Sequence, residues 1–277
     1  MRTLNCGRFI IDFDRPRIVG ILNVTPDSFS DGGRFLAPSD ALAHARDMVA
    51  QGADIIDIGG ESTRPGSRPV SVGEELGRVL PVLDSILGEL SVPISIDTSK
   101  PAVADECIAR GAHIINDVYG LRDPEMRRVA ARRGAPVIIM HMKGTPETMQ
   151  ADPQYEDVAS EVIGYLERQA ALAREAGIEQ IVVDPGIGFG KTLEHNLEIL
   201  RRLGEFRRLD YPLMVGASRK SFLRKITGDG PDDTADATLA SVAIAAYNGA
   251  DLLRVHDVAP ARRAVVVAAQ IRGIDVL

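Results

Sequence analysis

Residues 17–23 read RIVGILN, a nearly unbroken apolar run that ends at the polar Asn23. Seven later runs end in the same way, in a side chain that can take part in chemistry. They are ADIID ending at Asp57, PISID at Asp97, HIIN at Asn116, PVIIMH at His141, QIVVD at Asp184, LMVGASRK at Lys220 and DLLRVH at His256. A buried strand requires only apolar side chains, so eight polar ends predict eight strands that converge on one site. Such convergence is typical of a (β/α)8 barrel, whose active site lies where the strands end.

Segments with helical spacing separate these runs, and several end in a glycine, a common helix C-cap. Short Val- and Ile-rich strands alternating with helices predict parallel βαβ units. An open doubly wound sheet would bind its ligand at one switch point, whereas here all eight strands have polar ends. We therefore expect an α/β protein, a single (β/α)8 TIM barrel over residues 1–277. The segment TLNCGRFIIDF, residues 3–13, predicts a short hairpin that covers the amino-terminal end of the barrel.

The bulk composition excludes several classes of protein. The 277 residues are close to the ~250 of a typical barrel, and 45% hydrophobic residues argue against disorder. A net charge of −7 argues against nucleic-acid binding. No segment approaches the ~20 apolar residues of a membrane span. MRTLNCGRFIIDF lacks a long apolar stretch and a small-residue cleavage site, so we expect no secretory signal there. Cys6 and Cys107 lack metal-ligand spacing, so we expect a cytoplasmic protein.

The polar strand ends divide into two candidate groups. Asp97, Asn116 and Asp184 would suit a flat heterocycle with several N–H donors, although capping of the next helix is an alternative for Asp97. Asn23 offers a neutral oxygen that could bind Mg²⁺ together with substrate phosphates, or could cap its loop. Arg254 and His256, two apart on a strand, could bind polyphosphate oxygens or form a salt-bridged strand end.

Several loops carry further candidates. DPGIGFGKT, residues 184–192, is not a P-loop because Pro185 stands where the first glycine is required. Its glycines instead predict close approach of the backbone to a planar ligand, with Phe189 as an apolar wall. In GASRKSF, Lys220 could reach that ligand, and Ser221 should lie at a helix N-terminus that attracts a carboxylate. His141 should face the mouth, although a buried structural histidine is the alternative.

Seven blocks occur in order between about Arg17 and Val258: NVTPDSFSDGG, GGESTRPG, ISIDTSK, INDV, DPGIGFGK, GASRKSF and RVHDV. Together they resemble the signature blocks of the dihydropteroate synthase family, a group of pterin-binding TIM barrels. The resemblance implies condensation of (7,8-dihydropterin-6-yl)methyl diphosphate with 4-aminobenzoate, which yields 7,8-dihydropteroate and diphosphate in folate biosynthesis. It also implies a homodimer, and sulfonamides compete with 4-aminobenzoate in that family.

The resemblance assigns a role to each candidate residue. The pterin would be bound by Asp97, Asn116, Met140, Asp184, Gly188, Phe189 and Lys220. The diphosphate would be bound by Asn23, Arg254 and His256, with Mg²⁺ on Asn23. The aminobenzoate would be bound by Phe29, Thr63, Arg64, Pro65 and Ser221. The candidate catalytic residues are Asn23, Asp97, Lys220, Arg254 and His256. We expect Mg²⁺-assisted loss of diphosphate, followed by attack of the aromatic amine on a pterin-methyl cation.

Two long, glycine-rich loops follow the first two strands, over residues 24–40 and 59–75. Long loops without secondary structure in a compact domain are usually functional, so we expect both to close over the mouth. Their candidate mobile residues are Thr25, Asp27, Ser28, Asp31 and Ser62. Asp27→Ala or Asp31→Ala should lower turnover while leaving pterin binding nearly intact.

Two other functions remain as alternatives. A corrinoid-linked methyltetrahydrofolate methyltransferase has a related barrel but would not need the blocks TPDSFSDGG and ESTRPG. A catalytically silent pterin-binding paralogue would be expected to lose Asn23, Arg64, Lys220 or His256, and this chain has all four.

Overall fold

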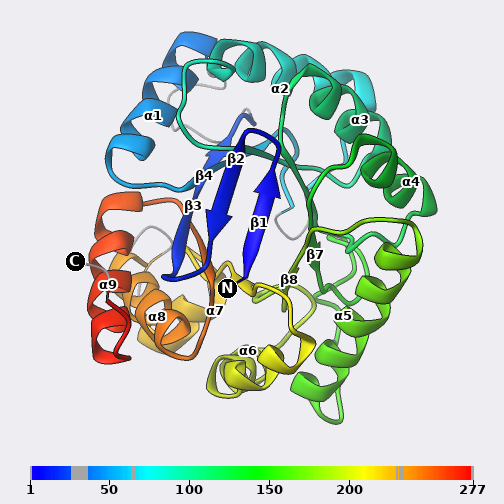
Figure 1. The fold of residues 1–277 in the computed structure, drawn as a ribbon. Helices are drawn as coiled ribbons and strands as arrows, with labels where there is room; N and C mark the ends of the chain where they lie inside the picture. The colour runs from blue at the N-terminus through cyan, green and yellow to red at the C-terminus, as the bar shows by residue number, and fades with distance from the viewer. Residues whose placement is uncertain (1, 26–36, 64–66, 229, 231–233, 276–277) are drawn as a thin grey trace.

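The computed structural model describes residues 2–25, 37–63, 67–228, 230 and 234–275. Eight parallel strands form a nearly closed barrel ringed by helices (Figure 1), which confirms the predicted TIM barrel. The strands are β3 (Arg17–Asn23), β4 (Ile55–Gly59), β5 (Ile94–Asp97), β6 (Ile114–Asp117), β7 (Val137–Met140), β8 (Ile181–Asp184), β9 (Met214–Val215) and β10 (Leu252–Val255). They lie in chain order around the barrel, and β10 pairs with β3.

The barrel closes between β8 and β9 through limited pairing. Val183 and Leu213 form a single bridge, and the Val183 amide donates to the carbonyl of Pro212 at 2.9 Å. Pro212 has no N–H, and the N–H of Leu213 donates to the Asp251 side chain at 2.9 Å instead of a strand carbonyl. These two features explain why β9 begins only at Met214. The strand ends at Val215, so Lys220, which the sequence places at the end of this strand, lies five residues beyond it.

Helices separate the strands, as the sequence predicts. They are α1 (Pro38–Ala50), α2 (Val72–Ile86), α3 (Pro101–Arg110), α4 (Pro124–Arg133), α5 (Val158–Glu175), α6 (Leu193–Arg201), α7 (Ser221–Thr227), α8 (Ala235–Tyr247) and α9 (Val258–Ile271), with a 3-10 segment over Leu203–Leu209. Gly111 and Gly134 follow α3 and α4 with positive φ, as expected for glycine caps. No helix in the described part of the chain is both long and apolar enough to cross a membrane.

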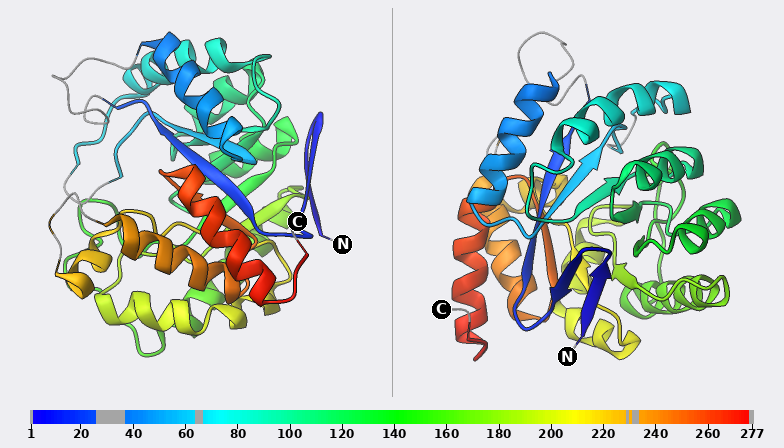
Figure 2. Two further views of the ribbon diagram at one scale, coloured as in Figure 1. Left: turned by 90° about the vertical axis from the view of Figure 1, so that its left-hand side faces the viewer. Right: turned by 45° about the horizontal axis from the view of Figure 1, so that its top comes forward.

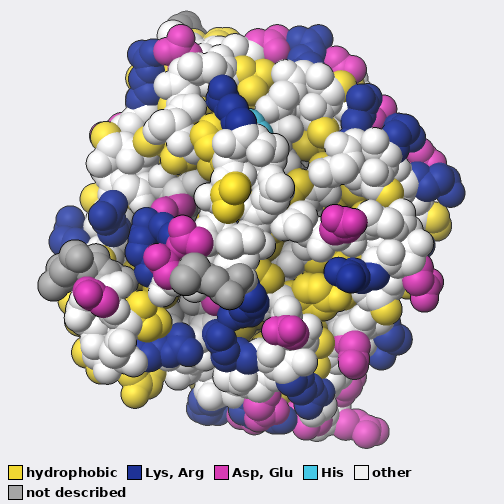
Figure 3. Space-filling view, viewed as in Figure 1, with side chains coloured by type: hydrophobic (Ala, Val, Ile, Leu, Met, Phe, Trp, Pro, Cys, Tyr) yellow, Lys and Arg dark blue, Asp and Glu magenta, His cyan; other side chains and the backbone are white. Residues whose placement is uncertain are grey.

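The antiparallel hairpin of β1 (Thr3–Cys6) and β2 (Phe9–Asp12) covers the amino-terminal end of the barrel, as predicted (Figure 2). Leu4, Cys6 and Ile11 pack against the lowest layer of barrel side chains, which comprises Val19, Ile55, Ile114, Ile138, Val182, Met214 and Leu252. Basic and acidic side chains are interspersed over this face (Figure 3), as on an ordinary solvated surface. The opposite end of the barrel, where the strands stop, is left for the site.

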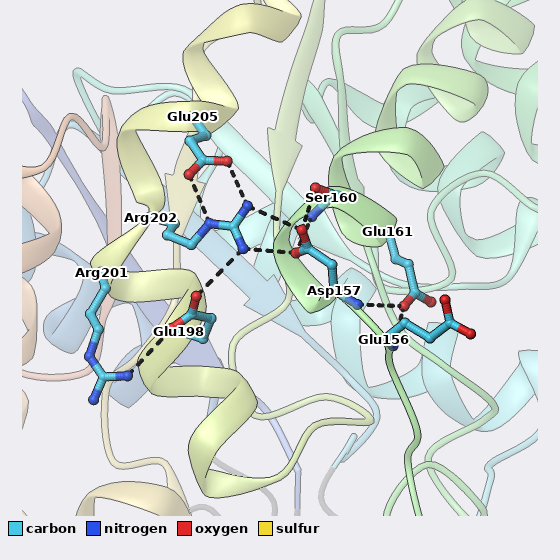
Figure 4. Close-up of polar contacts among 8 residues, drawn as sticks. All are labelled: Glu156, Asp157, Ser160, Glu161, Glu198, Arg201, Arg202 and Glu205. Carbon is cyan, nitrogen blue, oxygen red and sulfur yellow. Dashed lines mark hydrogen bonds and ion pairs between the residues drawn. The ribbon is translucent and has the colours of Figure 1, made fainter.

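A polar network on the outside of the barrel joins α5 to the segment after α6 (Figure 4). Asp157 caps α5 by accepting the N–H of Ser160 at 3.1 Å, and the same carboxylate binds Arg202 at 2.8 Å. Arg202 also binds Glu205 at 2.8 Å. Because Asp157 is the N-cap, α5 begins at Val158.

Candidate active site

The strand register aligns several candidate residues around the carboxyl end of the barrel. Asn23 of β3 is the partner of Gly59 in β4, Gly59 pairs with Asp97 in β5, and Asp97 pairs with Asn116 in β6. A Cβ atom at Gly59 would lie 3.4 Å from the Oδ1 of Asn23 and 3.6 Å from the Cβ of Asp97. The absence of a side chain at Gly59 therefore leaves space between the Asn23 and Asp97 side chains.

Arg254 links the carboxylates beneath this row. Its Nε donates to the Oδ2 of Asp57 at 2.7 Å, and its Nη2 donates to the Oδ2 of Asp97 at 2.6 Å. The Nδ2 of Asn116 also donates to the Oδ2 of Asp57, at 3.1 Å. Arg254 is thus engaged as the salt-bridged alternative predicts, while its Nη1 has no hydrogen-bond partner among the described residues. Asp97 does not cap α3, since Lys100 occupies the cap position.

The sequence predicts that Asp57 ends a strand, but it indicates no binding or catalytic role for this residue. The strand β4 continues for two residues beyond Asp57, to Gly59, so this carboxylate lies inside the barrel and not at its rim. Asp57 is fully buried, and its Oδ1 has no hydrogen-bond partner among the residues that the structure describes. Its two partners, Arg254 and Asn116, are far away along the chain, so no local pattern signals the pairing.

Burial changes the acid–base properties of three side chains at the mouth. It raises the pKa of Asp97 to about 7, although Arg254 opposes this change. It raises the pKa of Asp184 to about 6, and the N–H of Gly186 opposes that change. Burial lowers the pKa of Lys220 to about 8, with a further decrease from Arg254. Perturbed groups of both signs at one mouth are typical of a functional site.

An apolar wall lies on the other side of the mouth. The Nζ of Lys220 lies 3.8 Å from the centre of the Phe189 ring, a cation–π contact. Phe189 belongs to a buried cluster with Val118, Met140, Met142 and Met149. Met140 is also the register partner of Asp184. The structure therefore brings Met140, Asp184, Phe189 and Lys220 together, as the sequence predicts.

The glycines of the loop after β8 have a different main role from the predicted one. Gly186, Gly188 and Gly190 all have positive φ. A Cβ at Gly186 would lie 1.9 Å from the His141 carbonyl oxygen, and one at Gly190 would lie 2.6 Å from the Lys143 carbonyl oxygen. Gly186 and Gly190 therefore allow this loop to pack closely against the backbone that follows β7. A Cβ at Gly188 would instead lie 3.0 Å from the Lys220 side chain.

His141 does not face the mouth, and the buried structural alternative is correct. Its ring stacks edge-on against Tyr165 of α5, with centroids 4.9 Å apart, and its Nδ1 lies 3.0 Å from the Nζ of Lys191. Since successive strand residues point to opposite faces, His141 points outward where Met140 points inward.

Two spaces that share several lining residues open at the mouth. A pocket of about 150 Å³ is bounded by Asn23, Thr25, Ser62, Thr63, Asp97, Arg254 and His256, among others. A larger cleft of about 1030 Å³ is bounded by Thr63, Gly188, Phe189, Lys220, Ser221 and His256, and extends toward α1 and α8. Ser221 is the first residue of α7, as predicted. Phe29, Arg64, Pro65, Asp27, Ser28 and Asp31 lie outside the described residues.

A magnesium ion would fit beside Asn23. The Asn23 side chain has no hydrogen-bond partner within the described residues, and it borders the same pocket as Arg254 and His256. In that part of the chain, no group of three His, Cys, Asp or Glu side chains is arranged to bind a metal. Mg²⁺ is commonly bound by one or two protein oxygens together with waters and substrate phosphates, which suits a single free amide.

Comparisons with known proteins agree with this site. A family described as pterin binding enzyme matches residues 19–256. Dihydropteroate synthase of Escherichia coli strain K12 is 51% identical over 250 residues, which are 90% of this chain and 89% of that protein. The solved Yersinia pestis dihydropteroate synthase, with a sulfonamide drug complex, has a TM-score of 0.94 and 42% identity over 98% of this chain and 100% of that one.

The dihydropteroate synthase of Thermus thermophilus is similar in two complexes. The structure with 4-aminobenzoate has a TM-score of 0.87 and 47% identity, and the structure with 6HMPPP has a TM-score of 0.85 and 45% identity. Both cover 98% of this chain and 100% of the solved chain.

Proposed function

Because the chain belongs to the pterin-binding enzymes, and among them to the dihydropteroate synthases, we propose that its barrel mouth joins a dihydropterin to 4-aminobenzoate. The substrates would be (7,8-dihydropterin-6-yl)methyl diphosphate and 4-aminobenzoate, and the products 7,8-dihydropteroate and diphosphate. One observation carries this proposal: Asp97, Asp184 and Lys220 meet at one mouth, beside a pocket that Arg254 and His256 border.

The pterin would lie against Phe189 and Met140, with its polar edge toward Asp97, Asn116 and Asp184. Its ring N–H groups would donate to the two carboxylates, and Lys220 would donate to a ring nitrogen or oxygen. Phe189 and Lys220 already lie in contact, so the flat face and the donor come from one preorganised unit. This arrangement recognises a planar heterocycle through its shape and its donor pattern.

In the reaction, the bond between the pterin methylene carbon and the diphosphate oxygen would break, and its electron pair would leave with diphosphate. The pterin ring would delocalise the positive charge, which the carboxylates of Asp97 and Asp184 stabilise. The lone pair of the aromatic amine would form the new C–N bond, and its proton would pass to water or diphosphate. This order of events requires no strong base from the protein.

The diphosphate would bind to Arg254 and His256, with Mg²⁺ on the amide oxygen of Asn23. A bound Mg²⁺ ion neutralises charge on a leaving diphosphate. Arg254 has an unused Nη1 for this purpose, and Asp57 and Asp97 fix the direction of its guanidinium plane. The Nδ1 of His256 lies 3.0 Å from the Oγ of Ser218, a contact that orients the imidazole ring.

The aminobenzoate would occupy the cleft that Thr63, in the loop after β4, and Ser221, at the start of α7, both border. Its carboxylate would bind the backbone at Ser221. Phe29, Arg64 and Pro65 would complete this pocket when the two long loops close and exclude water from the cation.

We also propose that the protein is a cytoplasmic homodimer. Both cysteines are free and buried, which fits a reducing compartment. The side chains of Ile244 and Tyr247 on α8 are 50% and 51% exposed, and Val267 and Ile271 on α9 are also exposed, so these paired helices offer an apolar surface for a second copy. Analytical ultracentrifugation of the purified protein measures the oligomeric state, and a sedimenting species with the mass of two chains is the expected result.

The decisive experiment measures Mg²⁺-dependent diphosphate release from the dihydropterin-methyl diphosphate, with and without 4-aminobenzoate. Release that requires 4-aminobenzoate and yields dihydropteroate is the expected result. Pterin binding without release would favour the silent paralogue, and methyl transfer from methyltetrahydrofolate would favour the corrinoid-linked enzyme. No pterin binding would overturn the proposal.

A further inference from the structure

The lysine of the block DPGIGFGK takes no part in the proposed chemistry, yet it is among the most buried charged side chains of the protein. Lys191 is 3% exposed. Its Nζ donates to the carbonyl oxygen of Gly186 at 2.9 Å and to that of Phe189 at 3.0 Å. The third contact of Nζ is the Nδ1 of His141, at 3.0 Å. A lysine ammonium group has three donors, and this environment offers three acceptors.

The contact with His141 depends on the protonation state of Lys191, whose pKa burial lowers to about 7, although Asp184 opposes this decrease. When Lys191 is protonated, its ammonium group can only donate, so the Nδ1 of His141 accepts and the imidazole proton lies on Nε2. Burial, with a further effect of Lys191, lowers the pKa of His141 to about 2, so the ring stays neutral at physiological pH. His141 follows β7, and Lys191 follows β8. The pair therefore ties the loop after one strand to the end of the neighbouring strand.

The same loop forms the apolar wall of the pterin site. Its backbone is bound at several further points, by Asn196 at the Gly188 N–H (2.7 Å), by Gln150 at the Gly188 carbonyl (2.9 Å) and by Tyr155 at the Gly190 carbonyl (2.8 Å). Of these side chains, only Lys191 bonds to the backbone of Phe189, the residue whose ring lies against Lys220. The N–H of Phe189 also donates to the Gly186 carbonyl at 3.1 Å. Lys191 binds the carbonyls of both residues and so braces the turn that carries the ring.

We propose that Lys191 is a positioning residue for the pterin: its bonds to Gly186, Phe189 and His141 fix the loop so that Phe189 and Lys220 present one prearranged face to the ring. This inference rests on the proposed pterin site. It assigns Lys191 no contact with substrate, so its removal should affect pterin binding more than the chemical step or the binding of 4-aminobenzoate.

The test compares Lys191→Met with Lys225→Met, a control that removes the same charge from the exposed end of α7. Binding of the dihydropterin-methyl diphosphate with Mg²⁺ is titrated by calorimetry, and KM and kcat are measured for both substrates. Lys191→Met should raise the pterin dissociation constant about tenfold or more, while kcat and the KM for 4-aminobenzoate change by less than about threefold. Lys225→Met should match the wild type.

The histidine provides a second, milder pair of variants. His141→Leu removes the acceptor and should also weaken pterin binding, whereas His141→Gln supplies a side-chain oxygen and should restore most of it. If Lys191→Met does not fold, His141→Leu decides the matter. A folded variant of either kind that binds pterin like the wild type, or that loses kcat without losing pterin affinity, would overturn the inference. Absence of pterin binding by the wild type would instead overturn the proposed function.

Discussion

The guanidinium group of Arg254 and the carboxylate of Asp57 form an ion pair beneath the mouth of the barrel, with 2.7 Å between Nε and Oδ2. Burial opposes the charge of Arg254, but Asp57 and Asp97 raise its pKa above the ordinary value. Asp57 binds the arginine from below, and Asp97 binds it from the rim. The ion pair therefore connects the stability of the barrel with the orientation of a group proposed to bind the diphosphate.

Asp57→Asn should destabilise the protein by about 3 kcal/mol, because removal of one partner leaves a buried guanidinium group with reduced compensation. The double variant Asp57→Asn with Arg254→Met should recover part of this loss, since the uncompensated charge is then absent. Urea unfolding followed by circular dichroism gives the free energy of unfolding of the wild type, the two single variants Asp57→Asn and Arg254→Met, and the double variant. Additive losses in the double variant would show that the two side chains are not coupled.

Asp184→Asn should stabilise the protein while abolishing pterin binding. Burial raises the pKa of Asp184 from 3.8 to about 6, so the folded state binds its proton more tightly than the unfolded state. The ionised carboxylate thus costs stability, and this cost develops between about pH 4 and pH 6 and is complete above pH 6. The asparagine oxygen can still accept the Gly186 N–H, which the carboxylate accepts at 2.6 Å.

Asp184→Asn should raise the free energy of unfolding by about 1–3 kcal/mol at pH 8 and by much less at pH 4. Thermal unfolding at both pH values measures this difference. Asp236→Asn, at an exposed position of α8, is the matched control. It should lower the stability by less than about 1 kcal/mol at pH 8 and should give no gain at either pH value. A variant of Asp184 that is no more stable at pH 8 than the wild type would contradict the assigned cost of burial.

The sequence could predict the candidates that lie at or near the ends of short apolar strands. Asp97, Asn116 and Asp184 follow apolar runs whose alternation determines the face of each side chain, and the structure places all three at the mouth. Ser221 is likewise where the change from strand to helix predicts it. These positions depend on local geometry, which the sequence carries.

Other features depend on contacts between distant segments. Arg254 and Asp57 form an ion pair although they lie 197 residues apart along the chain. No local sequence pattern therefore indicates that Asp57 takes part in the site. His141 is instructive in another way. Met140 and His141 are adjacent, and period two forbids both from facing the mouth, so the alternation itself favoured the structural role for His141. No local pattern indicates the role of Lys191 either, because its histidine partner lies 50 residues away along the chain.

Pterin affinity should be greatest between about pH 7 and pH 8. Protonation of Asp97, with a pKa of about 7, and of Asp184, with a pKa of about 6, removes acceptors for the ring N–H groups as the pH falls. Loss of the proton from Lys220, with a pKa of about 8, removes a donor as the pH rises. Fluorescence titration with 6-hydroxymethyl-7,8-dihydropterin tests this, because that ligand lacks a titrating phosphate.

Lys220→Arg tests the loss of pterin affinity above pH 8, because a guanidinium group stays charged far above that pH. The decline in affinity above pH 8 should disappear, whatever the absolute affinity of the variant. The decline below pH 7 should remain, since Asp97 and Asp184 are unchanged. A profile that is flat in the wild type between pH 5 and pH 9 would rule out ionised carboxylates as the pterin acceptors.

Asn23→Ala should weaken binding of the dihydropterin-methyl diphosphate about tenfold in the presence of Mg²⁺, because the variant lacks the one protein oxygen assigned to the ion. Its affinity for 6-hydroxymethyl-7,8-dihydropterin, which has no diphosphate, should be unchanged. Calorimetry of both ligands with Mg²⁺ and with EDTA separates the two effects. In EDTA the variant and the wild type should bind the diphosphate ligand equally.

The matched control for Asn23→Ala is Asn5→Ala, which removes an exposed amide from β1 at the opposite end of the barrel. Asn23 borders the pocket shared with Arg254 and His256, and its side chain has no hydrogen-bond partner in the described residues, so its removal leaves no protein group unpaired there. The loss should therefore appear in ligand binding and not in thermal stability. An Asn23→Ala protein that keeps the Mg²⁺-dependent part of the affinity would show that the ion binds elsewhere in the mouth.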